Sequence, residues 1–566
     1  MKQRRSVIFS LLLSGVTWLA GCQTGPPAGA TQHSARGQSP ALAEDNLPPE
    51  QRAEAYARFA TGYSYELSER PDRAFEEYYK TVQLDPSNDG LVVDVARHLL
   101  ERRQIEQAWK LLARSAKRAD ADGTVYAWYS RACLALGKTN EAEAAGIEAV
   151  RRSPDALDGY ESLFRFYSSH ERQADALKVL LRAEKAPDPS GPFLLGLADE
   201  FEIWLRSSPK EAASIKPKVL SLLKRAAEES FDDPVLRQRL ADQLLARGES
   251  KTAGKLYLEL LDEFEDSPGI REALRERLAG IYLQSKDPKK ASAQLEAIVR
   301  DNPTRYPQAY YLLGSMAFDA RDYGKAADYF SKLKVISPDL DEAYYDLALV
   351  KITVDQPTEA LEILDQARSR FQQSFRGEFF TALAFVKTKN FAESVRHFNT
   401  AEVVGKATEP KRIDAPFYFQ FGAACERNKQ YEEAERNFLK ALKLQPRFAE
   451  CLNYLGYMWA DRNEKLDRAL DLIGQAVQIQ PKNGAYLDSM GWVFYRLKRY
   501  DEALKYELQA VQNLEEPDPS VYDHLGDIYT ALNQIGKARE AWQKSLKIEP
   551  SEEIRKKLEA AAKSSS

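Results

Sequence analysis

The chain has 566 residues, of which 29% are charged and 44% hydrophobic, and its formal net charge is −5. This mixture is typical of a soluble globular protein, and the length allows several domains or one long array. Because the net charge is slightly negative and nucleic-acid-binding proteins favour a basic patch, no nucleic acid is expected as a partner.

The N-terminus has the pattern of an export signal. A basic start at residues 2–5 precedes an apolar stretch over 7–20, which is too short to span a bilayer comfortably. The stretch ends in Leu-Ala-Gly-Cys, and this ending resembles a bacterial lipobox. The resemblance implies that the signal peptide 1–21 is removed and that Cys22 becomes a lipidated first residue. Its three acyl chains, such as palmitate, would give stable membrane attachment. The alternative is an ordinary secretory signal with a chance cysteine.

Residues 22–48 are predicted to tether the folded part to the membrane. Gly, Pro, Ala, Ser and Thr dominate there and no apolar period appears, so we expect a flexible linker that reaches roughly 25–30 Å. Gln23 follows the cysteine, in place of the aspartate that retains many lipoproteins in the inner membrane. By that family rule, the expected location is the outer membrane, with the lipid-anchored chain facing the periplasm.

From about residue 49 onward, apolar residues recur at steps of three and four, which predicts helices rather than strands. The clearest unit is 519–550. Its large residues stand at positions 4, 7, 11 and 24, its small ones at 8, 20 and 27, and a proline at 32. In that order these are Tyr522, Leu525, Tyr529, Trp542, Gly526, Ala538, Ser545 and Pro550. The pattern resembles the tetratricopeptide repeat, a helix hairpin in which small residues allow close approach and large ones fill the space beside them.

The repeat pattern divides the chain into blocks. Units that start at residues 55, 89, 123 and 157 are spaced by 34, which makes 49–190 an N-terminal block. The segment 191–233 breaks the register and is predicted to be a degenerate repeat or irregular helical connector, either a bend or a surface insertion. The pattern resumes over 234–550 as a C-terminal block, and 551–566 is predicted to be a capping helix and tail. The resemblance thus implies an all-α, right-handed α-solenoid of about 14 helix hairpins.

Sequence motifs for catalysis are absent. No phosphate-binding loop, HExxH motif or GxSxG elbow occurs, so no enzymatic activity, cofactor or metal is predicted. His524 stands beside Asp523 and Asp527, where a base or a metal ligand is conceivable, but a polar helix surface is the favoured interpretation.

The four cysteines form no CxxC pair and have no metal-ligand spacing. Beyond the predicted lipid site, Cys133 and Cys425 fall at position 11 of their units, where a buried thiol acts as a small hydrophobe. No disulfide is expected between Cys425 and Cys451, because such a bond would span about two helical turns.

The resemblance also implies where a partner binds. In the family, positions 2, 5, 9, 12 and 13 of each first helix line a concave face. From the unit at 307 onward, several of these positions hold apolar or aromatic residues outside the core pattern. We call them the groove strip: Tyr311, Phe318, Tyr345, Leu349, Ile352, Phe379, Leu383, Val386, Phe419, Tyr457, Trp492 and Tyr495. The strip predicts a site for an extended or helical apolar peptide segment. The alternative is tight winding that buries the strip inside the array.

The sequence therefore predicts a membrane-anchored, non-catalytic scaffold that binds other proteins on the periplasmic side of the outer membrane. At the level of architecture it resembles lipoproteins that serve pilus assembly, polysaccharide export or outer-membrane protein assembly. One alternative is direct polysaccharide binding, with Trp492 and Tyr495 stacking on sugar rings. A cytosolic adaptor is the other, if the lipobox is accidental. No oligomeric state is predicted.

Overall fold

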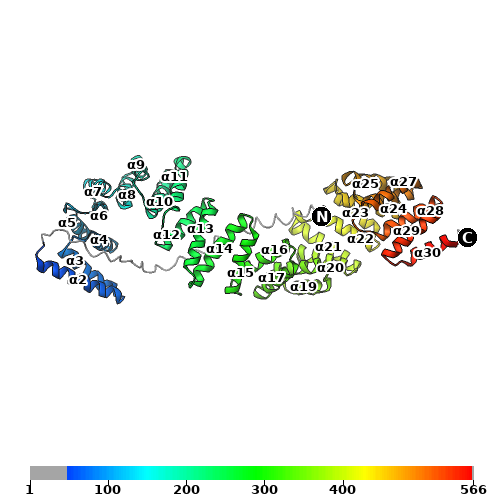
Figure 1. Cartoon of the computed structure of the whole chain (residues 1–566), viewed down its shortest axis with the longest axis horizontal. Helices are drawn as coiled ribbons and strands as arrows, with labels where there is room; N and C mark the ends of the chain where they lie inside the picture. The colour runs from blue at the N-terminus through cyan, green and yellow to red at the C-terminus, as the bar shows by residue number, and fades with distance from the viewer. Residues whose placement is uncertain (1–46, 564–566) are drawn as a thin grey trace. The chain divides into compact units, whose positions relative to one another are not determined.

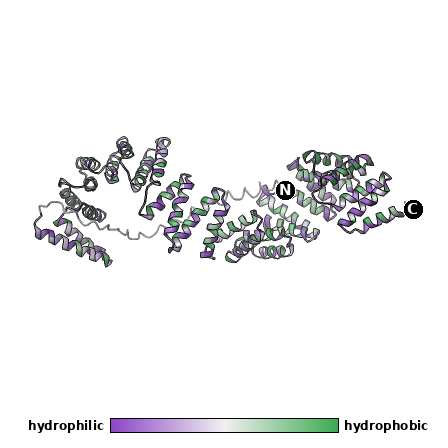
Figure 2. Cartoon of the chain, in the orientation of Figure 1, coloured by the Kyte–Doolittle hydropathy of each residue, from purple (hydrophilic) through white to green (hydrophobic). Residues whose placement is uncertain are grey.

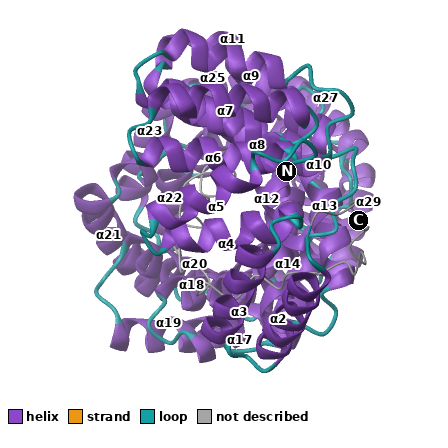
Figure 3. Cartoon of the chain, turned by 90° about the vertical axis from the view of Figure 1, so that its left-hand side faces the viewer, coloured by secondary structure: helices purple, strands orange, loops and turns teal. Residues whose placement is uncertain are grey.

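The computed structural model describes residues 47–563, and every regular element in this part of the chain is a helix (Figure 3). The predicted signal peptide 1–21, the lipidation site Cys22 and most of the tether lie outside the described residues. Among the residues that are described, none of the helices has both the length and the apolar character needed to cross a bilayer.

The chain forms two compact units, which divide between Leu256 and Tyr257 (Figure 1). The first contains α2 (Pro49–Leu67), α3 (Pro71–Leu84), α4 (Asp89–Glu101), α5 (Ile105–Ser115), α6 (Gly123–Ala135), α7 (Thr139–Arg152), α8 (Leu157–Ser169), α9 (Gln173–Ala183), α10 (Gly191–Ser207), α11 (Ala212–Ala226) and α12 (Pro234–Ala246). The division falls inside α13 (Ser250–Glu263), within the stretch that the repeat pattern treats as one block.

The second unit continues the same alternation of first and second helices. It contains α14 (Pro268–Gln284), α15 (Pro288–Asp301), α16 (Pro307–Asp319), α17 (Tyr323–Ile336), α18 (Asp341–Thr353), α19 (Pro357–Arg370), α20 (Phe375–Lys387), α21 (Phe391–Thr408), α22 (Ala415–Arg427), α23 (Tyr431–Leu444), α24 (Ala449–Asp461), α25 (Leu466–Ile479), α26 (Gly484–Arg496), α27 (Tyr500–Asn513), α28 (Pro519–Ala531), α29 (Ile535–Ile548) and α30 (Glu552–Lys563). Taken in order, α2 to α29 make fourteen helix pairs among the described residues. The predicted all-α array of about 14 hairpins is confirmed.

The turn inside each hairpin has one recurrent geometry. Position 15 of the repeat adopts a left-handed backbone in thirteen of the described pairs, with φ between 55° and 83°. These residues are Glu69, Arg103, Gly137, Glu171, Gly248, Lys286, Arg321, Asp355, Lys389, Lys429, Asn463, Lys498 and Asn533. The next residue returns its N–H to the carbonyl of position 11, as from Gln430 to Cys425 at 2.9 Å. This left-handed cap ends the first helix and reverses the chain.

The core lies between the two helices of each pair and between neighbouring pairs. Hydrophobic and hydrophilic residues alternate along the helices (Figure 2). Small residues at position 8 face large residues at position 24, as Gly422 faces Phe438: a Cβ on that glycine would lie 2.7 Å from the Phe438 ring. Because Phe438 is fully buried against Gly422, the two helices of this pair approach closely where position 8 has no side chain.

Two regions depart from this regular pattern. In the segment 191–233, α10 and α11 pack as a pair, but a short 3-10 helix at Pro209–Glu211 replaces the left-handed turn. At the C-terminus, α30 packs on α29 and buries Ile554 beside Trp542. The apolar end of the last pair is therefore covered by this additional helix.

Candidate partner-binding site

The groove strip lies on first helices of the second unit, from α16 to α26. Four of its residues are buried and the other eight are half-buried, so none of the twelve is an exposed side chain. The buried ones are Tyr345, Ile352, Phe419 and Trp492. The half-buried ones are Tyr311, Phe318, Leu349, Phe379, Leu383, Val386, Tyr457 and Tyr495. The alternative interpretation, burial within the array, therefore applies to four residues of the groove strip. That the other eight form a groove stays a prediction.

Packing between neighbouring repeats accounts for this burial. The Phe379 ring lies 5.4 Å from Phe375 and 5.9 Å from Phe417, measured between ring centroids, so it joins α20 to α22. The Tyr345 hydroxyl accepts a hydrogen bond of 2.9 Å from Ser374 Oγ, at the start of the next repeat. These side chains hold the stack of first helices together, and only part of their surface is left for a partner.

One part of the strip does open into a cavity. A pocket of about 150 Å³ is lined by Val386 of α20, Phe419 of α22 and Tyr454 of α24, three consecutive first helices. The remaining lining residues are Gln420, Ala423, Ala424, Arg427 and Glu450. Ala423, Arg427 and Glu450 stand at positions 9, 13 and 2 of their repeats, which the family pattern assigns to the concave face. Because they are small or charged, a search for apolar residues alone misses them.

The pocket has a rigid apolar wall and a charged rim. The Phe419 ring lies 5.3 Å from Phe448 and 5.7 Å from Tyr454, between ring centroids, so its position is set by aromatic packing. The rim residues Arg427 and Glu450 are exposed and carry opposite charges. The site can therefore take an apolar side chain while the flanking polar atoms stay in water.

A second cavity of about 390 Å³ lies among α21, α22 and α23, and most of its lining is polar. Glu402 is a buried residue of this lining. Burial alone would raise the pKa of this carboxyl, but hydrogen bonds from Lys406, Tyr418 and Lys440 outweigh it and the pKa is lowered. Because its buried charge is already matched by lysines of this chain, this cavity does not fit the apolar segment that the strip predicts.

Comparison with sequence models of known families identifies the repeats. Sequence models of the tetratricopeptide repeat match residues 276–341, 424–485 and 519–552. All three segments lie in the second unit, and the last of them spans the pair α28–α29. These segments of the chain are tetratricopeptide repeats. The family resemblance that the sequence predicts is thus confirmed, and proteins of this family bind other proteins or peptides.

Several known proteins are similar to parts of this tetratricopeptide repeat protein. The TPR repeat-containing protein PA4667 of Pseudomonas aeruginosa is 26% identical over 221 residues, which are 39% of this chain and 36% of that protein. The type IV pilus assembly protein PilF of the same organism is 29% identical over 133 residues, 23% of this chain and 52% of that protein. The chain thus spans about a third to a half of these relatives' lengths. The crystal structure of the APC/C hetero-tetramer Cut9–Hcn1 matches with a TM-score of 0.38 at 13% identity, over 84% of this chain and 96% of that one.

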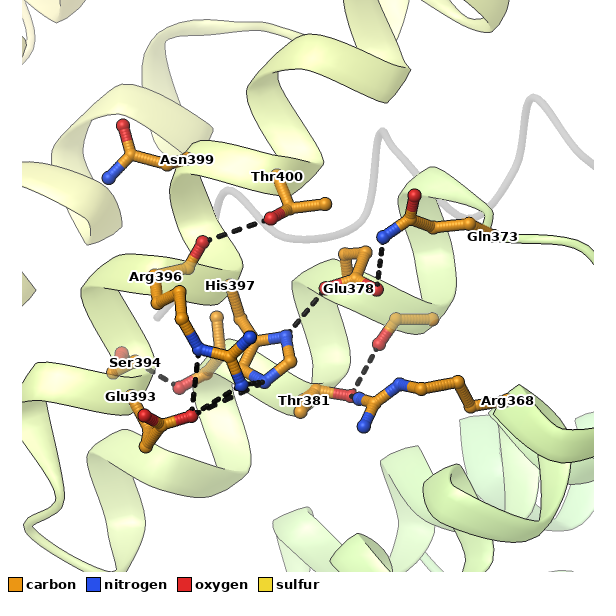
Figure 4. Close-up of polar contacts among 12 residues, drawn as sticks. Arg368, Gln373, Glu378, Thr381, Glu393, Ser394, Arg396, His397, Asn399 and Thr400 are labelled. Atoms are coloured by element: carbon orange, nitrogen blue, oxygen red, sulfur yellow. Dashed lines mark hydrogen bonds and ion pairs between the residues drawn. The ribbon is translucent and has the colours of Figure 1, made fainter.

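Inside the repeats, two buried histidines pair with carboxylates. His397 of α21 lies against Glu378 of α20, with His397 Nδ1 2.5 Å from Glu378 Oε2 (Figure 4). Gln373 donates a further hydrogen bond of 3.0 Å to the other Glu378 oxygen. Burial opposes the charge on Glu378, but these hydrogen bonds outweigh it and its pKa is lowered. This pair is complete within the fold and leaves no polar atom for a ligand.

The interpretation of His524 as part of a polar helix surface is wrong. The side chain is only 7% exposed, and its Nδ1 lies 2.8 Å from Oδ1 of Asp488, in the preceding repeat. The neighbouring Asp523 and Asp527 turn away and pair with Lys557 at 2.9 and 2.8 Å. The sequence analysis missed Asp488 because it is 36 residues from His524. Proximity along the chain pointed to the wrong carboxylates.

Proposed function

We propose that this tetratricopeptide repeat protein is a lipid-anchored scaffold of the outer membrane that holds apolar segments of other proteins in the periplasm. The pocket at Val386, Phe419 and Tyr454 carries the binding part of this proposal, since it opens on the face that the family uses for partners. The anchoring part rests on the sequence around Cys22. No step of catalysis is assigned, because the described pockets contain no pairing of a nucleophile with a base.

The shape of the pocket suggests the kind of group it takes. A cavity of this volume, with Val386, Phe419 and Tyr454 in a lining that is otherwise partly polar, is large enough for a benzene-sized group. We therefore assign it to a leucine or phenylalanine side chain of the partner, presented from an extended strand or one turn of helix lying along α20, α22 and α24. The opposite charges of Arg427 and Glu450 at the rim would fix the direction of that segment.

A role in assembling an envelope or secretion complex belongs to the same proposal. It is supported by the lipobox and by similarity to a protein whose name assigns it to type IV pilus assembly. The polysaccharide alternative has less support, because Trp492 is buried and its ring stacks on His524 at 4.1 Å between centroids. Little of that ring is open to a sugar.

Changing Val386 to Asp should weaken partner binding at least tenfold. The substitution puts a carboxylate into the space for an apolar side chain, and a loss of about 1.4 kcal/mol corresponds to a factor of ten in affinity. Val335→Asp is the matched control, because Val335 is exposed on the second helix α17. Both variants would be crosslinked in membranes and their captured proteins compared with those of the wild type. Equal capture by all three chains would contradict the pocket's role.

Changing Cys22 to Ser should release the chain from the membrane. Serine cannot form the thioether that carries the acyl chains, so we expect the protein to move from the membrane fraction to the soluble periplasmic fraction. Fractionation would measure this, and mass spectrometry of the N-terminal peptide would show whether Cys22 carries lipid. A variant that stays with the membrane would refute the anchor without bearing on the pocket.

A further inference from the structure

One repeat has a carboxylate where its neighbours have a large apolar side chain. Position 24 faces the small residue at position 8 in the centre of each helix pair. In other repeats it is apolar: Leu112, Leu180, Tyr257, Leu295, Phe330, Leu364, Phe398, Phe438 and Trp542. In the pair α26–α27 it is Glu507, which is 0% exposed and fills the space over Gly491. Neither of its carboxylate oxygens has a hydrogen-bond partner.

Two further ligand-type side chains meet Glu507 in the same buried space. Asp488 comes from α26 of the same repeat, and His524 comes from α28 of the next. All three residues are buried, and each offers a ligand atom within 4.8 Å of those of the other two. The ring of Trp492 stacks on His524, so the cluster is screened from water on that side.

His524 pairs with Asp488, but among the described residues no cation pairs with Glu507. Two carboxylates and one imidazole share a buried space, and the nearby cation Lys557 pairs with Asp523 and Asp527 instead. An unpaired buried charge is costly, so buried carboxylates in proteins are paired, protonated or bound to metal. Glu378 shows the paired arrangement, with a histidine on one oxygen and an amide on the other (Figure 4). Glu507 has no such partners and points at Asp488 and His524.

We propose that Asp488, Glu507 and His524 bind one divalent transition-metal ion of the Zn²⁺ class. A mixed set of imidazole and carboxylate ligands suits such ions, whereas Ca²⁺ and Mg²⁺ take six or more oxygen ligands, many of them from water. Zn²⁺ holds these ligand atoms at about 2.0–2.2 Å, which places them about 3.4 Å apart in a tetrahedral site. Side-chain shifts of about 1 Å complete that geometry, and a water takes the fourth position.

The location gives the ion a structural role in the stack of repeats. Its ligands come from both helices of one pair and from the first helix of the next, so the ion links α26, α27 and α28. The ion is thus a clamp between the last two repeats, at the end of the array that α30 covers. Metal binding should make these repeats open less often.

Metal uptake by the full-length, tag-free chain tests this directly. After treatment with a chelator, the wild type should bind one equivalent of Co²⁺ or Zn²⁺ by calorimetry, with a visible Co²⁺ absorption typical of a four- or five-coordinate site. Zn²⁺ should raise its unfolding temperature by several degrees, and Mg²⁺ should not. Asp488→Asn and Glu507→Leu should bind the ion at least a hundredfold more weakly.

The design separates loss of metal from loss of fold. Glu507→Leu installs the residue type found at this place in other repeats, so this variant should fold as well as the chelated wild type. His397→Gln is the matched control, since it changes the other buried histidine–carboxylate pair and should leave metal uptake unchanged. If the chelated wild type takes up no Co²⁺ or Zn²⁺ at millimolar concentration, or if Glu507→Leu binds either ion as tightly, the proposed site is refuted.

Discussion

Changing Phe417 to Ala should lower the free energy of unfolding by about 4 kcal/mol, the largest effect that we expect from a single substitution. Phe417 is almost fully buried at the start of α22. Its ring centroid lies within 5.9 Å of those of Phe375, Phe379 and Phe398, which belong to the preceding repeat. Removing a buried phenylalanine costs about 3–5 kcal/mol, since the apolar contacts are lost and the cavity closes only in part.

The stacked architecture decides how this loss is measured. Repeats contact only their neighbours, so a break between α20 and α22 can unfold part of the array first. Guanidinium unfolding followed by helix content should be combined with hydrogen exchange of the amides in α20 to α23. Leu444→Ala is the control, because Leu444 is 56% exposed and its loss should cost under about 0.5 kcal/mol. A loss below about 1 kcal/mol for Phe417→Ala would show that the aromatic packing is not needed for the stack.

The second large effect concerns the buried carboxyl of Glu200 in α10. Glu200 is 5% exposed, and burial, with repulsion from Glu161, raises its pKa to about 7 from an ordinary 4.5. Arg165 and Arg131 oppose the shift but do not cancel it. The folded state therefore keeps a proton that the unfolded chain has lost between these pH values. Stability should fall as the pH rises from about 4.5 to above 7, by about 3 kcal/mol for this shift.

Glu200→Gln tests the effect because glutamine has the shape of the protonated acid and cannot lose a proton. The variant should lose this part of the pH dependence and should be more stable than the wild type at pH 8, but not at pH 4.5. Unfolding by urea at a series of pH values would measure the difference. Identical pH profiles for the two chains would mean that Glu200 is solvated and has an ordinary pKa.

Repetition explains why so much of the fold could be predicted from the sequence. The periodic apolar positions and the small residues at position 8 act within one hairpin, so each unit can be recognised by itself. A break after residue 190 was predicted as well, because a run of Pro and Gly interrupts the register there. The division of the chain inside α13 was not predicted, because it depends on contacts between neighbouring helix pairs and has no local signal in the sequence.

The candidate site could be predicted only in part. Position numbers placed Val386 and Phe419 on the partner face, and both line the pocket. The burial of Tyr345 and Trp492 could not be predicted, because it depends on how far each first helix is rotated against the next. A residue outside the core pattern becomes a core residue when the following repeat covers it.

The sequence by itself determined the helix period, the number of hairpins, and the small and large residues that pack between the two helices of each hairpin. These features depend on contacts within about 34 residues. Only the tertiary structure decided which side chains of the groove strip stay open, and that Asp488, Glu507 and His524 meet. The first and last of these lie 36 residues apart, and stacking of one repeat on the next brings them within hydrogen-bonding distance. The glutamate at position 24 was a local sign of that cluster. It indicates a buried carboxylate only when the centre of the hairpin is known to be closed to water.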